Sequence, residues 1–118
     1  MKTNQAVMAF SQSEKIKAGL IWVSQIIEFM GGLSGEQKSG VQKSVIVLLR
    51  MVAQETALAK ALTGHEDWKV SEGHIEKALV MLDSGVEEEA MLQIARALSK
   101  VTNVGQQAMT QLQESGHL

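Results

Sequence analysis

Apolar residues recur at steps of three and four along most of the chain, which is the spacing of an amphipathic helix. In the first such stretch, five residues fall on one stripe: Ile16, Leu20, Val23, Ile27 and Met30. Ile21, Trp22, Ile26 and Phe29 widen this stripe. We therefore expect a first helix, at about residues 5–31, that is buried on more than one side.

Three further helices follow from the same periodicity. The second, at about residues 37–63, is apolar almost all round between Val45 and Ala53, so we expect it to be the central helix. A shorter third helix is predicted at about residues 70–83. The fourth, at about residues 86–114, has the most regular seam, which consists of Met91, Ile94, Leu98, Val101, Gly105, Ala108 and Leu112.

Glycine and serine mark the helix ends, because the chain contains no proline. Four glycines between residues 31 and 40 predict a flexible connection between the first two helices. Gly64 and Gly85 stand where a glycine just past the last turn would end the second and third helices. Ser34 and Ser84 each precede a Gln or Glu by three residues, which is the spacing of a capping box at a helix start.

The predicted fold class is all-α. No segment alternates apolar and polar residues between hairpin turns, as a half-buried strand would. The sequence thus predicts one domain over residues 1–118, built as an antiparallel four-helix bundle. We also consider its assembly as a dimer of helical hairpin pairs.

Composition restricts the class of protein further. The chain has 45% hydrophobic residues and a net charge of −2, which excludes an intrinsically disordered chain and gives no reason to expect a nucleic-acid partner. It has no cysteine, which excludes disulfides and thiol chemistry. The apolar runs 20–33 and 45–53 are shorter than the ~20 residues of a membrane span, and the run 6–10 is short for a secretory signal. We expect a cytoplasmic protein without a membrane partner.

The histidines and carboxylates do not form a recognisable metal or catalytic motif. A di-iron bundle needs two Glu-x-x-His pairs, and only Glu114 and His117 have that spacing. Neither a phosphate-binding glycine loop nor a nucleophile elbow is present. We therefore expect no bound metal, no cofactor and no enzymatic activity.

One short string suggests a different chemistry. His74 is followed one helical turn later by Lys77, and Ala78 is a small residue at the next position. This string resembles the neighbourhood of the phosphorylated histidine in histidine phosphotransfer domains, which are also four-helix bundles of about this length. The resemblance implies that His74 accepts a phosphoryl group and that Lys77 stabilises its negative charge. The alternative is an ordinary, partly exposed helix histidine.

Four other residues are candidates for contact with a partner: Trp22, Phe29, Arg50 and Trp68. Trp22 belongs to the wide apolar surface of the first helix, where we expect core or a dimer contact. Arg50 has apolar neighbours on both sides, so it is either buried against a carboxylate such as Glu28 or Glu55, or extends to the surface on its apolar stem. Trp68 either fixes a loop onto the bundle, which we favour, or is an exposed anchor.

These features favour an interaction module and not an enzyme. The first two helices have more apolar surface than one stripe each requires, and seven methionines suit adaptable contacts. We expect a small adaptor-like, chaperone-like or regulatory protein that self-associates as a homodimer or binds a protein partner. Phosphotransfer through His74 is the alternative function.

Overall fold

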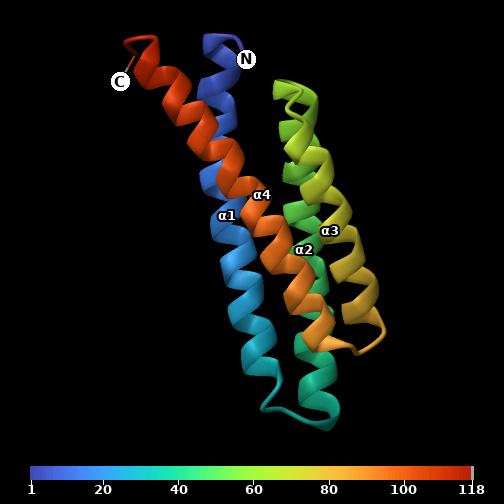
Figure 1. Ribbon diagram of the computed structural model, residues 1–118. Coiled ribbons are helices and arrows are strands. Elements are labelled where there is room, and N and C mark those ends of the chain that lie inside the picture. Colours follow the sequence, from blue (N-terminus) through green and yellow to red (C-terminus); the bar gives the residue numbers. More distant parts are fainter. Residues whose placement is uncertain (118) are drawn as a thin grey trace.

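The computed structural model describes residues 1–117 as four helices, which confirms the all-α four-helix bundle (Figure 1). The helices are α1 (Thr3–Met30), α2 (Gly35–Thr63), α3 (Glu66–Asp83) and α4 (Glu87–Glu114). Each connection is four residues or fewer, so consecutive helices run antiparallel.

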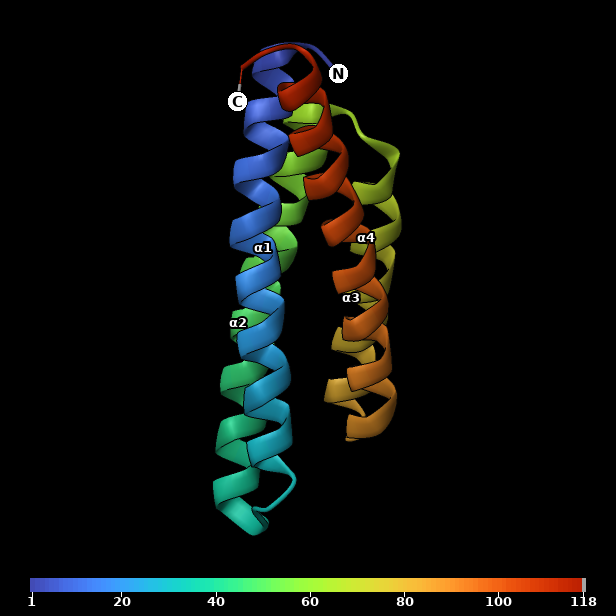
Figure 2. The same ribbon diagram turned by 60° about the vertical axis from the view of Figure 1, so that its left-hand side comes forward.

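The helices form a ring in which each packs against two neighbours. Backbone contacts join α1 to α2, α2 to α3, α3 to α4 and α4 to α1. Across one diagonal, a side-chain ion pair joins Lys38 of α2 to Glu87 of α4 (2.7 Å). The molecule is elongated, at 54 × 21 × 18 Å. Figure 2 shows that both termini lie at one end and that the α1/α2 hairpin extends beyond the α3/α4 hairpin at the other.

The predicted apolar stripes of the first and fourth helices form the core. All five stripe residues of α1 are at most 2% exposed, and Ile94, Val101 and Ala108 of α4 are fully buried. By contrast, the apolar middle of α2 is not central. Val47 and Met51 are each 55% exposed, because α2 has neighbours on only two sides.

Glycine positions predicted two helix ends, whereas serine positions were less informative. Gly64 ends α2 with a left-handed φ of 66°. Gly85, with a φ of 77°, follows α3, and Val86 N–H donates to Met81 O (2.8 Å) in the pattern of a Schellman motif. Ser84 therefore closes α3 and caps no helix start, which corrects the capping-box prediction there.

The connection between α1 and α2 is shorter than the predicted 31–40. It spans only residues 31–34, because α2 already begins at Gly35, whose φ is 60°. Ser34 occupies the N-cap position as predicted, but its side chain makes no capping hydrogen bond. Gly40 lies within the helix with open space around it.

α3 begins at Glu66, four residues before the predicted start. The N-cap is His65, whose ring Nδ1 accepts a hydrogen bond from Asp67 N–H (3.1 Å). Histidine is not among the preferred N-cap residues, so the sequence pattern did not indicate this helix start. Among residues 1–117, no helix is long and apolar enough to cross a membrane.

Candidate functional site

The most prominent surface feature is an apolar face on α1 and α2. We call Trp22, Ile26, Phe29, Leu48, Met51 and Leu58 the α1/α2 apolar face. Trp22 is 58% and Phe29 65% exposed, although the first helix was expected to be buried on more than one side. The expectation was wrong for a single chain because α3 and α4 cover only the opposite side of α1 and α2.

A hollow of about 310 Å³ interrupts this face between α1 and α2. Trp22, Leu48 and Met51 line it, together with Gly19. The two helices lie close together at Gly19, because a Cβ built there would be 2.8 Å from Val52 Cγ2. The hollow therefore has a tightly packed floor and an aromatic wall.

An ion pair lies at one end of the hollow. Lys15 Nζ is 2.9 Å from Glu55 Oε1, and Gln12 Nε2 donates to Glu55 Oε2 at 3.0 Å. These hydrogen bonds, the one from Gln12 first, hold the pKa of the Glu55 carboxyl below its ordinary value. The rim of the hollow thus carries one positive and one negative side chain, whose charges cancel.

Arg50 and Trp68 lie away from the α1/α2 apolar face. Arg50 is exposed and lines a shallow hollow with Glu76 and Asp83, but no carboxylate of residues 1–117 lies within ion-pair distance of it. It reaches the surface and is not paired with Glu28 or Glu55. Trp68 is fully buried, and its indole Nε1 donates to Thr63 Oγ1 at 2.8 Å. It is a packing residue, which corrects its inclusion among the partner contacts.

His74 lies on α3 beside α4, in the middle of the bundle. It is half-buried, and its Nδ1 lies 2.7 Å from the side-chain oxygen of Gln93. Since an amide oxygen can only accept, Nδ1 is the donor in this contact, and Nε2 makes no hydrogen bond to residues 1–117. The sequence analysis did not identify Gln93. It could have been found as a polar residue among the buried positions of α4.

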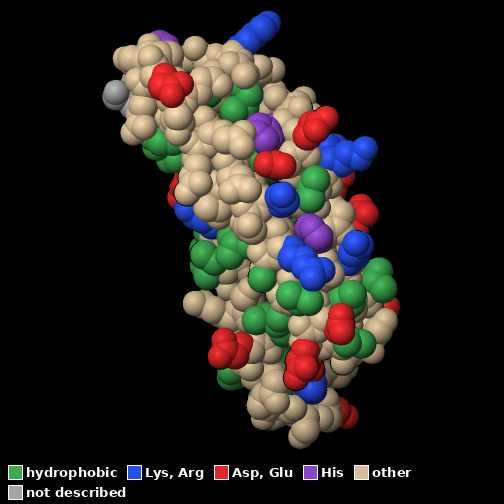
Figure 3. All heavy atoms as spheres, in the orientation of Figure 1, with side chains coloured by type: hydrophobic (Ala, Val, Ile, Leu, Met, Phe, Trp, Pro, Cys, Tyr) green, Lys and Arg blue, Asp and Glu red, His purple; other side chains and the backbone are tan. Residues whose placement is uncertain are grey.

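Basic side chains lie around His74. Lys77 is one turn further along α3, and Arg96 and Lys100 are one and two turns beyond Gln93 on α4. Among residues 1–117, none of these three forms an ion pair with a carboxylate. Figure 3 shows histidine, lysine and arginine side chains gathered over α3 and α4 on this face. We call His74, Lys77, Arg96 and Lys100 the α3/α4 basic patch.

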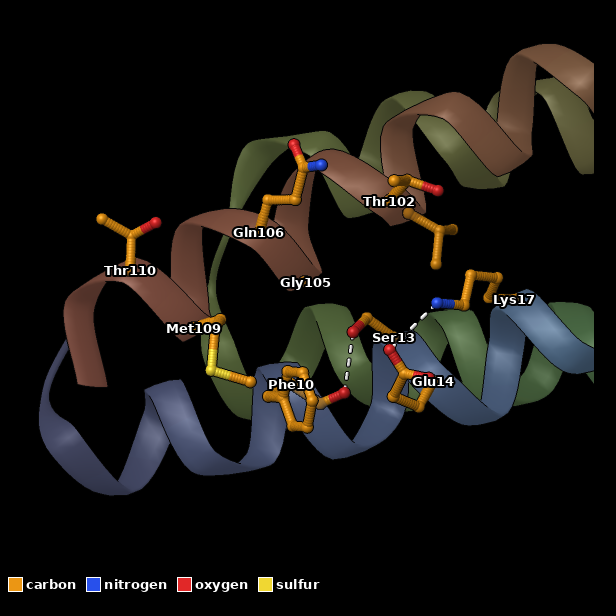
Figure 4. A pocket seen from close by; sticks show the side chains of 10 residues that line it. Phe10, Ser13, Glu14, Lys17, Thr102, Gly105, Gln106, Met109 and Thr110 are labelled. Carbon is orange, nitrogen blue, oxygen red and sulfur yellow. Dashed lines mark hydrogen bonds and ion pairs between the residues drawn. The ribbon is translucent and has the colours of Figure 1, made fainter. Parts of the chain in front are cut away.

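A third feature is a groove of about 430 Å³ between α1 and α4 (Figure 4). Met109 points from α4 toward Phe10 of α1, and the Lys17–Glu14 pair (3.0 Å) lies along the opposite part of the groove. Ser13 Oγ donates to Phe10 O at 2.7 Å. Every charged group that lines the groove is therefore already paired.

The described residues offer no metal site, and the comparisons offer no relative. Across residues 1–117, no three His, Asp or Glu side chains come together as metal ligands would. Comparison with protein-family models, with curated proteins and with solved structures finds no match. The function must therefore be inferred from the surfaces themselves.

Proposed function

We propose that this protein is a small helical interaction module that self-associates as a homodimer through the α1/α2 apolar face. The observation that carries the proposal is the exposure of Trp22 and Phe29, two of only four aromatic residues in the chain. They lie seven residues apart on one side of α1, and Leu48 and Met51 of α2 border the same face. Tryptophan in particular is enriched among the residues that dominate binding energy.

The size of the face supports the proposal. With roughly 150–250 Å² for each aromatic side chain, the exposed fractions of Trp22 and Phe29 leave on the order of 250 Å² of apolar surface. A standard interface buries about 800 Å² on each partner, of which about 57% is non-polar. The two aromatic side chains thus supply about half of the apolar area of a standard interface, and Leu48 and Met51 extend the face.

The test is the mass of the particle in solution, measured by light scattering at micromolar concentrations. We expect a dimer for the wild-type chain and a monomer for Phe29→Ser and Trp22→Ser. Val80→Ser is the matched control, because Val80 is 66% exposed on α3, outside the face, and its loss should leave the dimer intact. A monomeric wild-type chain would contradict the proposal.

Phosphoryl acceptance at His74 is the second candidate function, favoured by the hydrogen bond to Gln93. In this reaction Nε2 attacks the phosphorus of an acyl phosphate, the N–P bond forms, and the P–O bond breaks to release a carboxylate. Nδ1 donates its hydrogen bond to the side-chain oxygen of Gln93, and the cations of the α3/α4 basic patch lie near the negative charge of the phosphoryl group. Glu72, two residues before His74, forms an ion pair with Lys60 of α2 (2.7 Å).

Incubation with a phosphorylated receiver domain tests this second function. We expect an acid-labile label on the wild-type chain that is lost in His74→Gln. His65→Gln is the control, because His65 also contacts a glutamine of α4, Gln107, but lies at the start of α3. Failure to label the chain, or a label that survives His74→Gln, would exclude phosphotransfer.

The proposal includes a cytoplasmic location. Fractionation of cells that express the chain tests this part, and recovery outside the cytoplasmic fraction would contradict it.

A further inference from the structure

We infer that the two protomers pair antiparallel along α1, across a two-fold axis at the level of residue 24, so that Phe29 of each protomer enters the hollow beside Gly19 of the other. This inference rests on the proposed homodimer and specifies its geometry. It commits the α1/α2 apolar face to one occupant, a second copy of this chain.

The hollow has the size and the lining for an aromatic ring. Its volume is about 310 Å³, and its walls are Trp22, Leu48 and Met51. An apolar cavity of about 150 Å³ already suffices for benzene in a protein interior. A phenyl ring in this hollow would lie beside the Trp22 side chain, and aromatic pairs add about 0.5–1.5 kcal/mol to the effect of burial alone.

Phe29 is the matching projection on the same chain. It is 65% exposed and lies ten residues from Gly19, about 15 Å along α1 and within about 80° of it around the helix. A projection and a hollow separated along one face cannot fill each other within a chain. They can do so between two chains related by a two-fold axis, in which each contact occurs twice.

The antiparallel register also matches the remaining apolar side chains. With the axis at the level of residue 24, Ile26 of one protomer lies opposite Trp22 of its partner. The segment from Ala18 to Ile27 contains no charged residue, so no charge meets its own copy near the axis. The exposed Val80 on α3 has no such uncharged surroundings, because Glu76, Lys77 and Asp83 lie close to it in sequence.

Single cysteine variants test this geometry, because the chain has no cysteine of its own. Gln25 and Ser11 are both exposed polar residues of α1. In the antiparallel pair, the two copies of residue 25 lie about 3 Å apart along the helix direction, whereas the two copies of residue 11 lie about 40 Å apart. With a short bismaleimide, we expect Gln25→Cys to form a crosslinked dimer and Ser11→Cys to stay uncrosslinked.

The outcomes separate this geometry from the dimer itself. If light scattering shows a dimer but Ser11→Cys crosslinks as well as Gln25→Cys, or neither crosslinks, the antiparallel pairing is wrong and the proposed function stands. If the wild-type chain is monomeric, both fail. Addition of Phe29→Ser to Gln25→Cys should abolish the crosslink, and a crosslink that persists would overturn the role of Phe29.

Discussion

At the scale of single residues, two glycines set how closely α1 approaches its neighbours. A Cβ at Gly105 of α4 would be 2.6 Å from Ser13 Oγ, and one at Gly19 would be 2.8 Å from Val52 Cγ2. Both distances are shorter than a Cβ atom can approach another heavy atom, so a residue other than glycine would require its neighbour to move. Gly73 of α3 differs, because nothing lies within 4 Å of its Cβ position.

We expect Gly105→Ala to destabilise the fold by about 1–3 kcal/mol, because either the Ser13 hydroxyl must leave its hydrogen bond to Phe10 O or α1 and α4 must move apart. Gly73→Ala is the control and should stabilise by about 0.5–1 kcal/mol, through helix propensity alone. Urea unfolding measures both changes. If Ser13 Oγ is the obstacle, Ser13→Ala should recover part of the loss in the double variant; full additivity would contradict this account.

A second residue-scale prediction concerns the buried pair Trp68 and Thr63. The Thr63 hydroxyl accepts from the indole N–H and donates to Ala59 O. Thr63→Val keeps the shape but leaves the indole N–H buried without a partner, so we expect a loss of about 1–3 kcal/mol in the free energy of unfolding.

Thr56→Val is the matched control for this prediction. Thr56 is also fully buried, but its hydroxyl only donates to Val52 O of its own helix, so its replacement should change stability by less than about 0.5 kcal/mol. Equal losses in the two variants would show that the indole bond contributes nothing specific.

At the scale of helices, polar contacts fix the register of neighbouring elements. Gln12 and Lys15 of α1 both reach Glu55 of α2, Lys60 of α2 reaches Glu72 of α3, and the His74–Gln93 bond joins α3 to α4. The pairs at the surface add little energy individually. They nevertheless show which turns of neighbouring helices lie side by side. For α1 and α2, these are the turns of Lys15 and Glu55, at the rim of the hollow.

The α1–α2 contact predicts a pH dependence. Because the pKa of Glu55 is lowered in the folded chain, its contribution is fully present above the ordinary glutamate value of about 4.3 and is lost as the pH falls through the lower folded value. We expect Glu55→Gln to lose less stability than the wild-type chain between neutral pH and about pH 3, measured by urea unfolding. A wild-type stability that falls no more than that of Glu55→Gln over this range would contradict the expectation.

At the scale of the whole molecule, the ring of four helices leaves two long outer surfaces of different character. The α1/α2 apolar face exposes aromatic side chains, whereas the α3/α4 basic patch is polar and contains a histidine whose Nε2 has no hydrogen-bond partner among residues 1–117. The proposed dimer uses only the first surface. The second would remain accessible on both protomers.

If the chain dimerises, its stability depends on protein concentration, because only the folded form binds a second copy. We expect the melting temperature of the wild-type chain to rise by a few degrees when the concentration is raised tenfold. Phe29→Ser should show a lower and concentration-independent melting temperature, measured by circular dichroism. A wild-type melting temperature that does not change with concentration would argue against the dimer.

The sequence by itself determined the four helices, most of their ends and the core stripes. These are local properties: the spacing from Ile16 to Met30 places five side chains on one side of any helix, and the positive φ at Gly64 and Gly85 suits glycine wherever the chain goes next. The start of α3 was missed because His65 caps it through a ring nitrogen, which capping patterns do not include.

Only the tertiary structure decided which apolar side chains are covered. Trp22 and Trp68 look alike in sequence, yet one is 58% exposed and the other fully buried, because a helix in a ring of four meets neighbours on two sides only. The pairing of His74 with Gln93 likewise depends on the register of α3 against α4, which is set by packing between residues far apart in the chain. Periodicity shows that a side is apolar, but the arrangement of the other helices determines whether it is buried.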